Sequence, residues 1–222
     1  MKTSMKTQTL SLVQMALFSA IIVVMAFTPF LGYIPLGVTR ATIIHVPVII
    51  GSILLGPKKG AFLGGVFGLT SLIINTFTPT ITSFTFSPFY AGGNMCSLVI
   101  CFVPRILIGI VPYFVYKSLS ALFKQPKKKG LWDTLSLGVA GLLGSLVNTG
   151  LVMSLIYVCF GKSYAAAKEV SYDVLYTVIL SVVAVNGVPE AIVAAILTAV
   201  ICKVLIRFLR SSSAGAGTVV QK

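Results

Sequence analysis

The sequence predicts an all-α integral membrane protein with six transmembrane helices. Charged residues make up only 9% of the 222-residue chain and hydrophobic residues 57%, whereas a soluble domain carries about 25% charged residues. The apolar residues fall into separate runs, several of them as long as the ~20 residues that a helix needs to cross a bilayer. We expect one transmembrane domain over residues 1–210, followed by a disordered tail at 211–222.

The apolar runs place the six expected spans in order along the chain. They cover residues 9–27, 41–55, 60–76, 94–116, 134–160 and 174–209. The second and third runs are short for a membrane span. The sixth is longer than a bilayer requires, so it is expected to tilt or to project into the cytoplasm.

Small residues repeat every four positions in two of the expected spans. Gly60, Gly64 and Gly68 share one face of the third span, which lets another helix approach closely. Ala16 and Ala20 share a face of the first span in the same way. Internal packing is the more common explanation for both patterns. The alternatives are a subunit interface for the glycines and a flat docking surface for the alanines.

The segment between the third and fourth spans, FTPTITSFTFSPFYAGG at residues 77–93, carries no charge. A solvated loop normally carries charged residues, and this one is instead rich in threonine, serine, proline and aromatic residues. It is therefore interpreted as an ordered cap over a cavity, or as re-entrant backbone that is buried in protein.

Two isolated charges of opposite sign interrupt the later spans. Arg105 lies in the fourth span, within CFVPRILIG, and Glu190 lies near the start of the sixth, within NGVPEAIVAA. An arginine at the bilayer centre costs about 2.5–3.5 kcal/mol on insertion scales, so such residues face a partner, a cavity or a ligand. Either the two charges pair with each other, or Arg105 presents its guanidinium to an anionic group of a ligand.

Amide side chains accompany these charges. Asn186 precedes Glu190 by one helical turn, Asn148 lies in the fifth span, and Asn75 lies at the outer end of the third. Each amide can either bond a neighbouring helix or contact a ligand.

Basic residues predict the orientation. Arg105 lies inside a span, and only Arg40, Lys162 and Lys168 fall in the segments expected on the outside; all other lysines and arginines fall on the side of the termini. Because basic residues collect in cytoplasmic loops, both termini are expected inside. The net charge of +13 thus indicates orientation and attraction to anionic lipid. No nucleic-acid partner is expected, since no soluble basic domain is apparent.

The same composition argues against an enzyme or a metal protein. The chain has one histidine, His45, and four acidic residues, which do not supply the cluster that catalysis requires. The four cysteines form no CxxC pair. We therefore expect no catalytic residues, no metal and no cofactor, and no Walker A motif is present for ATP hydrolysis.

Several stretches resemble one transporter family. HVPVIIGSILLGPKKGAFLGGVFGLTSLI, FSPF, PRILIG and VNGVPEAIV, together with the Ala-x-x-x-Ala of the first span, are similar to segments of S components. These are the substrate-binding membrane subunits of energy-coupling factor (ECF) vitamin transporters. The resemblance covers residues 9–210 and implies a six-helix bundle in a bacterial cell membrane that binds a vitamin from the outside.

The resemblance also implies partners and a gate. The S component would dock through Ala16 and Ala20 on a membrane coupling subunit, which carries two cytoplasmic ATPases. Residues 28–40 would act as a gate, and the vitamin would lie under the segment between the third and fourth helices.

The resemblance is greatest to the pantothenate-type branch of the family. Pantothenate is a small anion with hydroxyls and an amide, which suits one buried arginine together with asparagine and glutamate. Trp132 is the sole tryptophan and lies at a cytoplasmic helix start. Phe84, Phe86, Phe89 and Tyr90 could still stack on a flat ring, so riboflavin-, folate- and pyridoxine-type ligands remain alternatives.

A self-sufficient, proton-coupled secondary transporter is the other alternative, with Glu190 as the proton carrier. For the S-component hypothesis, the expected substrate-binding residues are Arg105, Glu190, Asn186, Asn148, Asn75, Phe86 and Tyr90.

Overall fold

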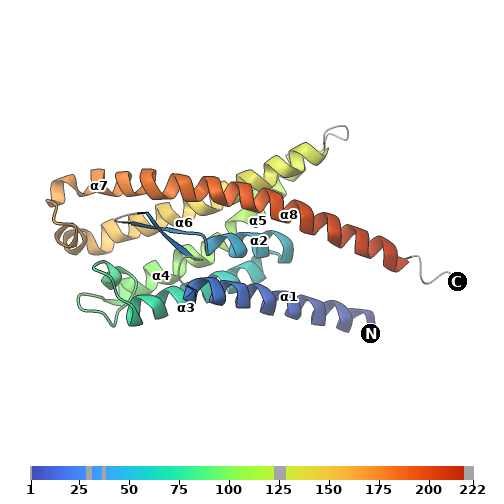
Figure 1. Ribbon diagram of the computed structural model, residues 1–222, viewed down its shortest axis with the longest axis horizontal. Helices are drawn as coiled ribbons and strands as arrows, with labels where there is room; N and C mark the ends of the chain where they lie inside the picture. The colour runs from blue at the N-terminus through green and yellow to red at the C-terminus, as the bar shows by residue number, and fades with distance from the viewer. Residues whose placement is uncertain (1, 29–31, 37–38, 123–128, 218–222) are drawn as a thin grey trace.

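The computed structural model describes residues 2–28, 32–36, 39–122 and 129–217. Its helices form an elongated bundle in which α1 begins and α8 ends at the same end (Figure 1). The helices are α1 (Lys2–Phe27), α2 (His45–Leu55), α3 (Pro57–Phe77), α4 (Met95–Ile108), α5 (Val111–Leu122), α6 (Lys129–Ala167), α7 (Leu175–Val182) and α8 (Val188–Gly217). The short elements are strands β1 (Tyr33–Leu36) and β2 (Thr39–Thr42), the 3₁₀ turns η1 (Ser83–Thr85) and η3 (Tyr172–Val174), and the π-helical turn η4 (Val183–Gly187).

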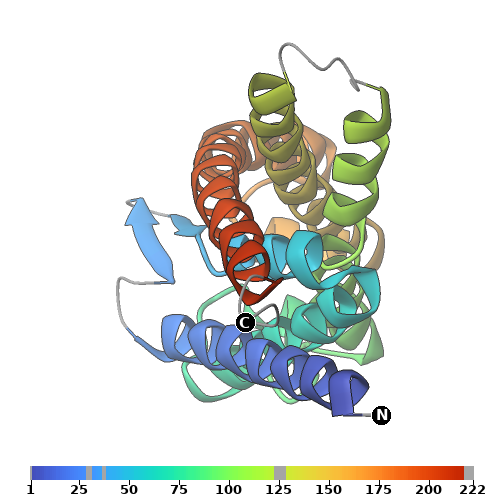
Figure 2. The ribbon, with the colours of Figure 1, turned by 90° about the vertical axis from the view of Figure 1, so that its right-hand side faces the viewer.

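Five helical stretches in the described residues are long and apolar enough to cross a membrane. They cover residues 8–27, 57–77, 95–122, 130–167 and 172–208. The remaining expected span corresponds to α2, an apolar helix of 11 residues. At 1.5 Å per residue α2 rises only ~16 Å, about half of the hydrocarbon core of a bilayer. Most of α2 is buried, so neighbouring helices rather than lipid surround it (Figure 2).

The fold is helical, as expected, apart from a short β-hairpin in the segment before α2. The second span, expected at residues 41–55, becomes helical only at His45, because Thr42 belongs to strand β2. β1 and β2 pair antiparallel, with Tyr33 opposite Thr42. Pairing in a hairpin satisfies backbone groups locally. The expected gate at residues 28–40 contains most of this hairpin, and its residues 29–31 and 37–38 lie outside the described part of the chain.

Breaks in the helices account for the other boundaries. Gly56 separates α2 from α3 with a φ of 92°, a conformation that favours glycine, and Pro57 occupies the first turn of α3. The expected fourth span is interrupted at Gly109, where α4 gives way to α5. α6 kinks at Phe160, the expected end of the fifth span. α8 continues to Gly217, into the tail that was expected to be disordered.

The glycine face of α3 packs against α4, which confirms internal packing for this pattern. A Cβ atom added at Gly64 would lie 2.0 Å from the carbonyl oxygen of Arg105, and one at Gly60 would lie 2.0 Å from the carbonyl oxygen of Gly109. No side chain fits at that separation, so the two backbones are in direct contact. This α3–α4 seam fixes the position of Arg105 along the bundle.

The alanine face of α1 is placed differently. Ala16 and Ala20 are both exposed, and only 11% of the apolar stretch of α1 is buried. α1 lies along one margin of the bundle (Figure 2). The internal packing favoured from composition is therefore wrong for these alanines.

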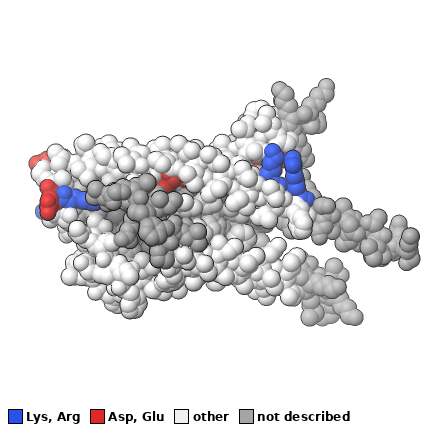
Figure 3. All heavy atoms as spheres, viewed as in Figure 1, with Lys and Arg blue, Asp and Glu red and all other residues white. Residues whose placement is uncertain are grey.

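Figure 3 shows a visible face that is almost free of charge between two charged ends, as a lipid-facing surface requires.

Candidate ligand-binding cavity

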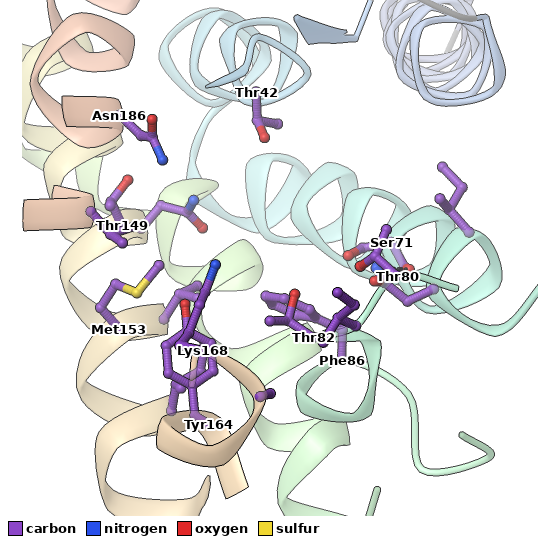
Figure 4. Close-up of a pocket in the computed structure, with 18 of the residues that line it drawn as sticks. Thr42, Ser71, Thr80, Thr82, Phe86, Thr149, Met153, Tyr164, Lys168 and Asn186 are labelled. Carbon is purple, nitrogen blue, oxygen red and sulfur yellow. Dashed lines mark hydrogen bonds between the residues drawn. The ribbon is translucent and has the colours of Figure 1, made fainter. Parts of the chain in front are cut away.

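A cavity of about 580 Å³ lies between the helices at the end of the bundle opposite the start of α1 (Figure 4). Its volume falls within the ~300–1,000 Å³ range of small-molecule sites. α3, α4, α6, α7, η4, α8, the end of β2 and the segment 78–93, called the cap below, all contribute to its wall. Residues as far apart in the sequence as Thr42 and Glu190 therefore meet around one space.

Exposure distinguishes the mouth of the cavity from its inner end. Ile81 of the cap is 73% exposed, and Glu169, just after α6, is also exposed. Arg105 and Asn186 are each only 7% exposed. Arg105 lies ten residues beyond the first residue of α4, Met95, which is ~15 Å along the helix. The cap and the end of α6 thus form the mouth, and Arg105 lies deep in the wall.

Arg105 is held in place from three sides. Its Nη1 donates a hydrogen bond of 2.7 Å to the carbonyl oxygen of Ile100. Its guanidinium carbon lies 5.6 Å from the ring centroid of Phe67 on α3 and 5.0 Å from that of Phe86 in the cap. Such cation–π contacts strengthen when they are shielded from water. The arginine is therefore oriented by its own helix, by α3 and by the cap together.

Glu190 lines the same cavity and connects α8 to the hairpin. Its Oε1 accepts a hydrogen bond from the backbone N–H of Thr42, the last residue of β2. The charge of Arg105 acts on the Glu190 carboxylate. The structure thus brings the two isolated charges to one site, as both hypotheses for Arg105 require.

The π-helical turn η4 presents Asn186 to the cavity. Pro189, three residues later, has no N–H to donate to the preceding turn, and a local π-helical adjustment accommodates such a loss. π-turns are frequent at functional sites. Pro189 lies in the first turn of α8, which begins at Val188.

α6 contributes the wall beside η4, where Thr149 lies next to Asn186 (Figure 4). Asn148 and Thr149 line its inner part, followed by Val152, Met153 and Ile156 at helical spacing. The Oδ1 atom of Asn148 is buried and has no hydrogen-bond partner among the described residues. Because buried polar atoms are nearly always satisfied, this acceptor marks a place where the hydroxyl or amide donor of a ligand would be stabilised.

The cap is ordered, as the sequence analysis expected, and Asn75 tethers it. The Oδ1 of Asn75 accepts a hydrogen bond of 2.9 Å from Ser83, and its Nδ2 donates one of 2.8 Å to the carbonyl oxygen of Ser71. Phe86, also in the cap, lines the cavity. Tyr90 is not among the lining residues and packs on a hydrophobic cluster with Ile156 and Phe160.

Sequence reasoning missed several lining residues. Thr42 lines the cavity beside the hydrogen bond that its backbone N–H donates to Glu190, a placement that its residue type does not reveal. Tyr164 and Lys168 belong to a segment that was expected to be an ordinary outer loop. Thr149 and Met153 did carry a signal, because they lie next to Asn148 and one turn further along the same helix.

The family model for the substrate-specific component of ECF transporters matches residues 10–202. The chain belongs to this family of S components. It is therefore a multi-pass subunit of the plasma membrane that acts in transport and is not an enzyme.

Two curated relatives are similar to the chain. A protein of Lactococcus lactis subsp. cremoris named pantothenic acid transporter PanT is 43% identical over 155 residues, which cover 67% of this chain and 73% of that protein. A protein of Leuconostoc mesenteroides named pantothenate transporter PanT is 38% identical over 149 residues, or 64% of this chain and 66% of that protein.

Proposed function

We propose that this S component binds pantothenate in the cavity and delivers it as part of an ATP-driven ECF transporter. The observation that carries the proposal is a single cavity lined by a buried arginine, a carboxylate, amides and an apolar wall on α6. Arg105 donates to an oxygen of the ligand. Glu190, Asn186 and Asn148 face its hydroxyl and amide groups, and the methyl groups pack on α6.

The aromatic residues of the cavity favour such a ligand over a flat vitamin. Phe67, Phe86 and Tyr164 line it, and a cation of the protein lies within 6 Å of each ring centroid. A riboflavin- or folate-type ring would have to displace these contacts in order to stack. Asn75 acts in this proposal mainly by holding the cap over the bound vitamin.

We also propose the partner and the orientation. Both termini lie in the cytoplasm, as the positive-inside rule indicates, so the cap faces the outside. The exposed face of α1 that carries Ala16 and Ala20 docks on the coupling subunit, which carries two ATPases. The hairpin acts as the gate, which Glu190 holds through Thr42.

The direct test is to purify the chain alone in detergent, identify any co-purifying small molecule by mass spectrometry, and titrate the emptied protein with pantothenate. Stoichiometric pantothenate with nanomolar affinity supports the proposal. Tight binding of riboflavin instead would show that the cavity takes a vitamin other than pantothenate. Uptake that persists in cells without the coupling subunit and ATPases would favour a proton-coupled secondary transporter.

A further inference from the structure

A second cation lies at the mouth of the cavity, away from Arg105. Lys168 lines the cavity just after the end of α6, and its Nζ lies 5.9 Å from the ring centroid of Tyr164. Figure 4 shows both residues on the α6 side of the cavity, across from Thr82 and Phe86 of the cap. Lys168 is half-buried, so it can meet a ligand that is only partly stripped of water.

The end of α6 fixes Lys168 in this position. The backbone N–H of Val170 donates to the carbonyl oxygen of Ala165, and that of Glu169 donates to Ala166. These two bonds form the motif that ends a helix on a left-handed residue, a position normally taken by glycine. Here Glu169 occupies it, with a φ of 55°, and Lys168 directly precedes it. The backbone of Lys168 is therefore constrained.

The distribution of charge indicates which end of the ligand Lys168 meets. The inner part of the cavity holds the Glu190 carboxylate and the unsatisfied acceptor of Asn148, together with the guanidinium of Arg105. A ligand carboxylate placed there would have to share Arg105 with the like charge of Glu190, would face the Asn148 acceptor, and would lose all of its hydration. Hydroxyl and amide N–H donors suit that end instead. Glu169 also lies at the mouth, but it is exposed, and its charge is screened by water.

We propose that Lys168 forms an anion subsite at the mouth that binds the carboxylate of the ligand, so that its hydroxyl-bearing end points inward to Glu190 and Asn148. This inference rests on the proposed function and deepens it, because it assigns a direction to the bound molecule. In this arrangement Arg105 contacts the middle of the ligand, at its amide oxygen.

The test compares two ligands on matched variants. Pantothenate and pantothenol differ only in that a primary alcohol replaces the carboxylate, so their affinity ratio reports the carboxylate contact. Isothermal titration is performed on the wild type, Lys168→Met, Lys168→Arg and, as a control, Lys162→Met. Lys162 is an exposed lysine near the same end of α6 and does not line the cavity.

We expect Lys168→Met to weaken pantothenate about tenfold and to leave pantothenol within about twofold. Lys168→Arg should restore the preference for pantothenate, and Lys162→Met should not change it. An unchanged affinity ratio in Lys168→Met, whether both affinities stay the same or both fall equally, would overturn the subsite. Should Lys168→Met misfold, the ratio in Lys168→Gln decides by the same criterion. A wild type that binds neither ligand would instead refute the proposed function, and the subsite with it.

Discussion

Two helices of this protein carry small residues at the same spacing and use them in opposite ways. The glycines of α3 are buried against the backbone of α4, whereas the alanines of α1 are exposed along the edge of the bundle. Spacing of this kind predicts a close helix–helix contact. It does not predict whether the second helix belongs to the same chain. The α3–α4 seam builds the cavity, and the α1 face is available to a partner.

Enlarging the exposed face of α1 should abolish transport and leave binding intact. Ala16→Trp places a bulky side chain where we propose that the coupling subunit packs closely. Vitamin uptake in cells that contain the complete transporter should fall to background, while the titrated affinity of the purified chain stays unchanged. Val200→Trp, at a position on α8 that is 57% exposed, is the control for the size of tryptophan. Normal uptake in Ala16→Trp would remove the docking assignment.

Enlarging a residue on the buried glycine face of α3 should instead lower the stability of the protein and weaken ligand binding. Gly64→Ala puts a methyl group against the carbonyl oxygen of Arg105, so α3 and α4 must separate. We expect a loss of about 2–3 kcal/mol of stability, visible as a lower melting temperature, together with weaker ligand binding because Arg105 moves. Gly65→Ala is the matched control, since its Cβ would meet open space and alanine favours the helix by about 1 kcal/mol. Equal effects at the two positions would contradict the seam.

Arg105→Ala tests the role of the residue whose position the α3–α4 seam fixes. We expect the affinity for pantothenate to fall at least tenfold, and that for pantothenol to fall similarly, because Arg105 is assigned to the shared part of both ligands. Arg207→Ala, at an exposed position near the other end of the bundle, serves as the control. Intact binding combined with a lower melting temperature would show instead that Arg105 is a structural partner of Glu190.

The same contrast explains how much the sequence could predict. Arg105, Glu190, Asn148 and Asn186 stood out because polar groups in apolar runs are expensive, and all four line the cavity. Lys168 did not, because lysine is unremarkable in a segment expected to be a loop. Its placement depends on how α6 kinks and ends.

Some elements of the fold could likewise be predicted from the sequence and others could not. Hydropathy located the long helices and the gap between the second and third runs, where the structure has a glycine followed by a proline between α2 and α3. The hairpin was not predicted because its two strands are only four residues each. The burial of α2 also escaped, since an 11-residue apolar helix depends on its tertiary neighbours.

The smallest expected effect concerns Glu169, whose backbone holds a conformation that glycine adopts more easily. Glu169→Gly should raise stability by about 1 kcal/mol, because the left-handed conformation penalises any residue with a Cβ atom. Glu169→Ala removes the same carboxylate but keeps the Cβ, so it separates backbone strain from charge. We expect a higher melting temperature in Glu169→Gly alone, with pantothenate affinity equal or slightly tighter in both variants because an acid has left the mouth. Equal stabilisation in the two variants would show that the carboxylate, rather than the backbone, is the source of the strain.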